Sequence, residues 1–314
     1  MTIKHSPGLG PQQGRTLLEL LISITIGLVI LGALIAIYLS THSSSRQSAA
    51  ISRLNEDAGI ALNLLGTQLR MAGFSPPRVH MTPGAALVNG VLVSVPDRNF
   101  VGAGIRGCDH GFVSHTADDF EKLACAGGTS GAAAFAIRFE GLNPADIDSV
   151  QALLPPNEDC LNQEVTTDPM GALGVNYRLV ESRFLVRVGP ASGTFELSCA
   201  GNGGLFAANP VMQFVEDMTV VYGVAEDGLS REVTSYLKAA GIDALPGSVD
   251  QRWSRVVTVS VCILMRSAEP DPAGAGSYVD CEGASKPSEN GLIRRAYRSV
   301  FTLRNRGGFA GSVS

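Results

Sequence analysis

The sequence predicts an α+β fold, in which one long N-terminal helix packs on an antiparallel β-sheet head. Two observations predict it. Residues 16–39 are almost continuously apolar, and residues 51–72 then repeat apolar positions at helical spacing. Beyond Pro77 the chain consists of short alternating runs separated by glycine- and proline-rich turns, with no helical pattern between them. Strands that lack crossover helices form antiparallel sheets.

The apolar run at residues 16–39 contains one charged side chain, Glu19. About 20 apolar residues suffice to cross a bilayer, so residues 15–40 are expected to form a transmembrane helix. A secretory signal peptide has a shorter apolar core followed by a small-residue cleavage site. Here the small-residue break, Gly14, precedes the run. Because a carboxylate inside a membrane helix is costly, Glu19 is a candidate functional residue.

The helix is expected to continue past the membrane as an amphipathic half over residues 41–75. Its apolar positions are spaced three and four residues apart, which places them on one helix face. They are Ile51, Leu54, Ala58, Leu62, Leu65, Leu69 and Ala72. Gly73 and the Pro76-Pro77 pair then provide a stop.

Residues 76–314 are expected to form a single β-rich head. The candidate strands are residues 86–95, 133–139, 177–188, 194–199, 218–224, 256–265 and 298–303. In the 256–265 run, one face of the strand is predicted to carry Val257, Val259, Val261, Ile263 and Met265.

Composition fits a globular protein with an added membrane segment. Of 314 residues, 45% are hydrophobic and 17% are charged, and the formal net charge is -5. Residues 1–14 carry only one charged side chain, Lys4, so their removal makes the net charge one unit more negative. This mild acidity argues against a nucleic-acid binder.

All six cysteines follow the apolar segment, and an even number in an exported domain favours disulfides. They are Cys108, Cys125, Cys160, Cys199, Cys262 and Cys281. Six thiols allow about 15 pairings, and pairing between sequence neighbours closes the shortest loops, so it is the expected arrangement.

Metal binding and catalysis find little support in the sequence. Cys108, His110, His115 and Cys125 could offer zinc two sulfurs and two imidazoles, but their spacing fits no common closed zinc site. The chain has no Gly-x-Ser-x-Gly elbow and no His-Glu-x-x-His motif. We therefore expect a protein that is not an enzyme and that has no metal or cofactor.

The segment Gly14-Arg15-Thr16-Leu17-Leu18-Glu19 resembles the class III signal of type IV prepilins. The resemblance implies that residues 1–14 are a leader, which a prepilin peptidase removes after Gly14. Arg15 would then be the N-methylated first residue, although the family usually has Phe there. Glu19 would pair with the N-terminal amine of a neighbouring subunit. The alternative is an ordinary signal anchor with a glutamate near its cytoplasmic end.

The head resembles the PilW family of minor pilins. The similar segments are residues 69–74 (LRMAGF), 211–224 (VMQFVEDMTVVYGV), 253–259 (WSRVVTV), 264–267 (LMRS) and 294–306 (RRAYRSVFTLRNR). The resemblance implies a non-catalytic subunit that takes part in initiating type IV pili, in a priming or tip complex. Its implied partners are other minor pilins and the major pilin through N-terminal helices, the prepilin peptidase, and inner-membrane lipid before assembly. The head would lie in the periplasm and later in the pilus (fimbrium) at the cell surface.

Two other functions remain open at this point. One is a J-type minor pseudopilin of type II secretion, and the other is a membrane-anchored exported binding or enzymatic domain. The arginines 294, 295, 298, 304 and 306 could contact a partner pilin or DNA. We expect them instead to be the solvent-facing arginines of a strand and its flanks, so nucleic acid is an unlikely partner.

Overall fold

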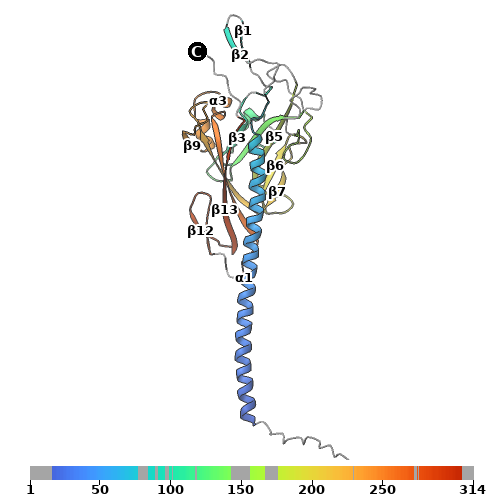
Figure 1. The fold of residues 1–314 in the computed structure, drawn as a ribbon, viewed down its shortest axis with the longest axis vertical. Coiled ribbons are helices and arrows are strands. Elements are labelled where there is room, and N and C mark those ends of the chain that lie inside the picture. Colours follow the sequence, from blue (N-terminus) through green and yellow to red (C-terminus); the bar gives the residue numbers. More distant parts are fainter. Residues whose placement is uncertain are drawn as a thin grey trace, which may run out of the picture. The chain divides into compact units, whose positions relative to one another are not determined.

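The computed structural model describes residues 16–76, 84–88, 91–95, 99–100, 102–116, 119–142, 156–166, 176–228, 230–271, 274 and 276–305. The chain divides into two compact units, Met1–Ala49 and Ala50–Ser314. Helix α1 (Leu17–Met71) supplies residues to both units (Figure 1). One long helix with antiparallel sheets confirms the predicted α+β class.

In the first unit, the hydroxyl groups along α1 donate hydrogen bonds to carbonyl oxygens of the helix itself. Ser23 Oγ donates to the Glu19 carbonyl (2.8 Å), Thr25 Oγ1 donates to that of Ile22 (2.9 Å), and Thr41 Oγ1 donates to that of Ile37 (2.8 Å). These polar groups therefore need no water, which suits a helix in an apolar environment.

In the second unit, the C-terminal part of α1 buries one face against the head. The buried residues are Leu54, Ala58, Ala61, Leu65, Gly66 and Leu69. Leu62 is partly buried and packs on the same core, whereas Ile51 is half-buried and is not part of it. The helix stops as predicted, because Gly73 adopts a positive φ of 76° and donates its N–H to the Arg138 carbonyl (2.9 Å).

Two antiparallel sheets form most of the head. The five-stranded sheet has the order β3 (Ile105–Cys108), β4 (Ala134–Gly141), β5 (Arg178–Val188), β6 (Phe195–Gly201) and β7 (Asn209–Gln213). The four-stranded sheet has the order β13 (Leu292–Thr302), β10 (Val256–Pro270), β8 (Val215–Val224) and β9 (Ser235–Leu237).

Smaller elements complete the described part of the head. They are the hairpin of β1 (Gly84–Val88) and β2 (Val91–Val95), the hairpin of β11 (Ser277–Val279) and β12 (Ser285–Pro287), the 3-10 helix η1 (Phe120–Lys122), and the short helices α2 (Ala239–Asp243) and α3 (Val249–Trp253). The sequence predicted one strand at residues 86–95. The structure has two strands there, paired as a hairpin, so the prediction missed the turn between them.

A single residue, Phe214, separates the two large sheets along the chain. It lies between β7 and β8 with a positive φ of 62°. Its N–H donates to Phe195 of one sheet (2.9 Å), and its carbonyl accepts from Arg266 of the other (3.0 Å). This bend explains why the head has two large sheets, where the sequence suggested one.

One core joins α1 to both sheets, with Leu65 of α1, Phe184 of β5 and Ile263 of β10 among its members. Along β10, Val259, Val261, Ile263 and Met265 face this core as predicted. Val257 does not, because the register with β8 shifts between Val256 and Thr258 and Val256 takes the core position. Such a bulge exchanges the faces of a strand.

Close packing of α1 on β13 predicts opposite effects for two glycine substitutions. A Cβ atom on Gly66 would clash with the Phe301 ring, whereas one on Gly59 would have nothing within 4 Å. We expect Gly66→Ala to lower the free energy of unfolding by about 1–3 kcal/mol through overpacking. Gly59→Ala should raise it by up to about 1 kcal/mol, since alanine favours helix. Denaturant unfolding of the two variants measures this, and equal stabilities would contradict the packing.

Candidate functional site

Glu19 lies in the first turn of α1, where Thr16 acts as the N-terminal cap. The Glu19 N–H donates to Thr16 Oγ1 (3.3 Å), and the Leu20 N–H donates to the Thr16 carbonyl (3.2 Å). A Thr-x-x-Glu sequence is the pattern of a capping box, and a carboxylate here is favoured by the helix dipole. Gly14 and Arg15, the predicted processing residues, lie outside the described residues.

The N-terminal part of α1 exposes apolar side chains on all sides. The large apolar residues of 17–39 are 49–82% exposed within the chain. By length and composition, α1 is the one helix among the described residues that could cross a membrane. Such a surface can be covered by lipid or by other apolar helices.

Each cysteine pairs with its sequence neighbour, which is the arrangement expected from the sequence. The disulfides are Cys108–Cys125, Cys160–Cys199 and Cys262–Cys281. The first joins β3 to the segment before β4, the second joins residues 156–166 to β6, and the third joins β10 to the β11–β12 hairpin.

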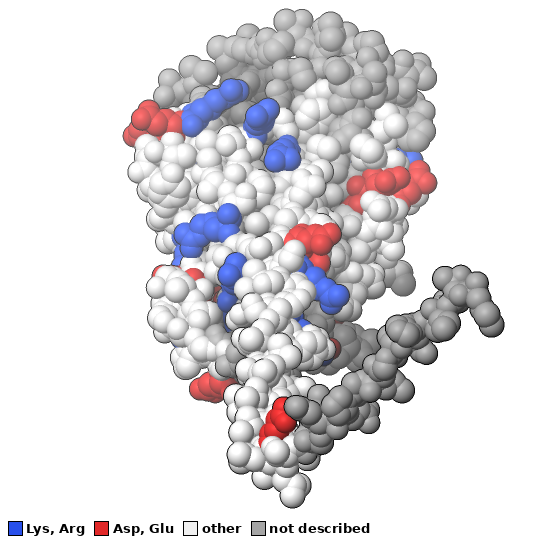
Figure 2. All heavy atoms as spheres, turned by 60° about the horizontal axis from the view of Figure 1, so that its bottom comes forward, with Lys and Arg blue, Asp and Glu red and all other residues white. Residues whose placement is uncertain are grey.

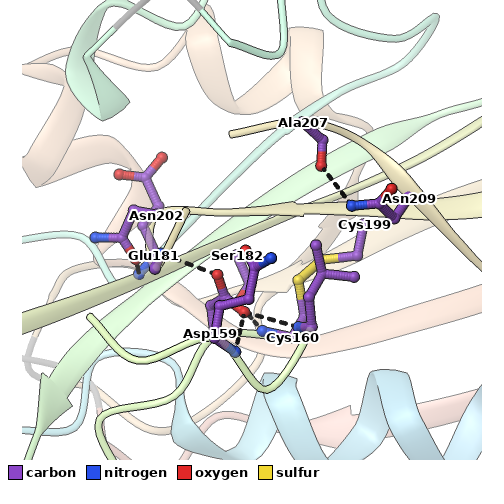
Figure 3. The surroundings of a disulfide bond; sticks show 11 residues. Asp159, Cys160, Glu181, Ser182, Cys199, Asn202, Ala207 and Asn209 are labelled. Atoms are coloured by element: carbon purple, nitrogen blue, oxygen red, sulfur yellow. Dashed lines mark hydrogen bonds between the residues drawn. A yellow bond between two sulfur atoms is a disulfide. The ribbon is translucent and has the colours of Figure 1, made fainter. Parts of the chain in front are cut away.

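The polar side chains around the Cys160–Cys199 disulfide are used in hydrogen bonds that hold the local structure (Figure 3). The buried Asp159 carboxylate accepts backbone N–H groups from Leu161 (2.8 Å), Gln163 (3.1 Å) and Gly203 (2.9 Å). Asn202 accepts from Glu181 N (2.8 Å) and donates to the Leu179 carbonyl (2.7 Å). These bonds use the polar atoms of Asp159 and Asn202 to hold loops on the sheet.

The zinc alternative finds no support in the geometry. Cys108 and Cys125 bond to each other, and His110 Nδ1 lies 3.3 Å from the Gly131 carbonyl. Throughout the part of the chain that the structure describes, no group of three or more His, Cys, Asp or Glu side chains could hold a metal ion.

The arginines of the C-terminal run have different surroundings, and the solvent-facing prediction was wrong for Arg294. Its guanidinium contacts both oxygens of Glu216 (2.6 and 3.0 Å). Arg295, Arg298 and Arg304 are exposed, and Arg298 also donates a hydrogen bond to the Cys281 carbonyl. Arg306 lies outside the described residues. On the face drawn in Figure 2, small groups of basic and acidic side chains are interspersed over a largely uncharged surface.

A pocket of 520 Å³ lies against β8, and the sequence analysis did not predict it. It is lined by Glu216–Val220 of β8, the segment 129–133, Val186, Phe195, Asp109, His110, Lys238, Glu282 and Lys286. The one sequence feature that points to it is the acidic pair Glu216-Asp217 inside an otherwise apolar strand.

Asp217 differs from the other acidic residues of this pocket. Glu216 pairs with Arg294, Glu282 pairs with Lys238, and Asp109 accepts the N–H groups of Ala239 and Ala240. Among the described residues, Asp217 has no ion pair within bonding distance; its Oδ1 accepts the Met218 N–H (2.8 Å). Burial raises the pKa of the Asp217 carboxyl.

Comparison with known proteins relates part of the head to one family. Residues 183–305 match the family described as Type IV Pilus-assembly protein W. No protein with curated annotation matches the chain in sequence. Among solved structures, the chain is similar to a type IV-like pilin from Thermus thermophilus, with 11% identity, a TM-score of 0.40, and coverage of 81% of this chain and 98% of that one.

The family match covers the C-terminal part of the head, from within β5 to just after β13, and helix α1 lies outside it. The PilW resemblance predicted from the sequence is confirmed over these residues.

The disulfides predict that the purified, unreduced protein contains no reactive thiol. Alkylation followed by intact-mass measurement should leave the mass unchanged before reduction and add six labels afterwards. Metal analysis of the same sample should find no zinc. Stoichiometric zinc with two alkylated cysteines would contradict the Cys108–Cys125 bond.

Asp217→Asn is predicted to stabilise the head at neutral pH by on the order of 1 kcal/mol or less. The amide keeps an acceptor for the Met218 N–H and removes a half-buried charge. Because the folded-state pKa is raised above 3.8, the difference should be smallest below that pH, where the carboxyl is protonated in both states. It should grow as pH rises through the folded-state pKa. Urea unfolding across this range measures it, and a variant less stable at pH 7 would contradict the prediction.

Proposed function

We propose that this protein is a minor pilin, a non-catalytic subunit that takes part in initiating type IV pili. One observation carries the proposal: the helix surface of residues 17–39 is apolar and exposed all round, with Glu19 as its one charged side chain. The match of the head to a pilus-assembly family supports it. A prepilin peptidase cuts after Gly14, and Arg15 becomes the methylated N-terminus.

In this proposal the helix holds the protein in the inner membrane, with the head in the periplasm, until assembly begins. The helix then leaves the lipid as helices of other minor pilins and the major pilin cover the same apolar surface. Both environments shield apolar side chains from water, so the exchange needs little change in hydrophobic burial. The subunit moves with its partners to the cell surface as part of the pilus.

Glu19 gives this exchange a defined register. The first turn of α1 begins next to the proposed new N-terminus, so an ammonium group and a carboxylate are present in each subunit near the same level of the helix. In a bundle, the carboxylate of one subunit pairs with the amine of its neighbour, because either charge alone would be costly among apolar side chains. A helix displaced along its axis would lose that pair.

Glu19→Ala should therefore leave membrane insertion intact and reduce piliation severely. Removing one partner of a buried ion pair costs about 3–5 kcal/mol, while losing the carboxylate makes insertion into lipid easier. The measurements are membrane fractionation and counts of surface pili in a strain whose only copy carries the change.

Ser23→Ala is the matched control, since it removes a polar group one helical turn further on without touching a charge. It should assemble normally. Normal piliation in the Glu19→Ala strain would count decisively against the proposal, and loss of membrane insertion in that strain would show that the residue acts earlier.

A further inference from the structure

Part of one edge of β8 has no neighbouring strand among the described residues. β10 pairs along one edge, and β9 covers the other edge only from Tyr222 to Val224. Further along that edge, one backbone contact is present, the hydrogen bond from Ala133 N–H to the Met218 carbonyl (2.7 Å).

Val220 lies between these two covered points. In an antiparallel strand, alternate residues direct both their N–H and C=O groups to the same edge. Met218 bonds to Ala133 on this edge and Val224 bonds to Thr234 of the β9 side, so Val220 directs its backbone groups to the same edge. Its side chain is buried in the core, which leaves the strand edge itself facing the pocket.

The walls of this 520 Å³ pocket offer both apolar and charged contacts. Val186 and Phe195 come from the neighbouring sheet, and Phe195 is 43% exposed. Four carboxylates and two lysines line the pocket. Three of the carboxylates already have partners, and Asp217 has no cation within bonding distance in the part of the chain that the structure describes.

We propose that this pocket binds an extended peptide segment that pairs with the β8 edge at Val220 and places a lysine or arginine side chain against Asp217. Strand addition supplies backbone hydrogen bonds, and the side chain supplies selectivity. The aliphatic stem of such a side chain packs on Val186 and Phe195 while its charged end reaches the carboxylate.

We take the segment to come from a neighbouring pilus subunit, and this part of the inference rests on the proposed function. The residues that would bind the segment all lie in the head. Burial raises the pKa of the Asp217 carboxyl because it disfavours the charged form. A cation bound beside this carboxyl would favour the charged form instead.

The test uses the full-length protein in detergent micelles and fluorescein-labelled, amide-capped peptides of sequence Thr-Val-Lys-Val-Thr and Thr-Val-Glu-Val-Thr. Fluorescence polarisation should show saturable binding of the lysine peptide, at least about tenfold tighter than the glutamate peptide. Asp217→Asn should reduce this preference to within about threefold. The exposed Glu226→Gln variant, which does not line the pocket, should keep it.

A third peptide, Thr-Val-Lys-Val-Thr with N-methylated valines, tests the strand pairing. Loss of its backbone donors should weaken binding by at least about tenfold. The proposal is overturned by absent saturable binding at about 1 mM lysine peptide, by equal affinity for lysine and glutamate peptides, or by unchanged affinity after N-methylation. Peptide binding is measured independently of piliation. If peptide binding fails but the Glu19→Ala strain loses its pili, the protein is a minor pilin without this site. If peptide binding succeeds but that strain is piliated normally, the head binds peptides outside a pilus role.

Discussion

The exposed apolar surface of residues 17–39 of α1 decides which surroundings this protein can occupy. Burying a leucine or isoleucine side chain is worth about 1.5–3 kcal/mol. Such residues recur throughout residues 17–39, where each is at least 49% exposed. Within its own unit, no other described segment covers them. Such a surface suits an apolar environment, which lipid or other apolar helices can supply.

The head supplies its own stability, which leaves the helix surface available for that environment. One core includes α1 residues after Ala50 and both large sheets. Three disulfides close loops between residues 17, 39 and 19 positions apart. Loops of this size are each worth about 3–4 kcal/mol through the entropy of the unfolded chain. In the proposed assembly, the head can thus stay folded while the apolar half of α1 moves from lipid into the helix bundle.

The bend at Phe214 links the two sheets of this core to the pocket at β8. It ends β7 and starts β8 in the other sheet, and the Arg266 guanidinium lies over the Phe214 ring at 4.9 Å. Because β8 leaves one sheet for the other at this point, part of its edge faces segment 129–133 and the pocket instead of a full-length strand. The change of sheet at Phe214 therefore places the acidic residues Glu216 and Asp217 of β8 in the wall of this pocket.

Sequence periodicity predicted the features that depend on local pattern. The apolar run, the helix face through Leu65 and Leu69, and most strands follow from spacing, because burial of one face imposes it. Other features depend on contacts between distant segments. The need for glycine at position 66 comes from its contact with Phe301, which is far away in the sequence. Val256 replaces Val257 in the core because of a bulge, which is visible only in the pairing of the strands. The pocket combines residues from Asp109 to Lys286, so no local motif marks it.

The most direct test of the account is the N-terminal mass of the protein recovered from the membrane fraction and from sheared pili of the cells that make it. The account predicts one mature chain beginning at Arg15, present in both fractions. A chain that retains residues 1–14 and is found in membranes alone would contradict it.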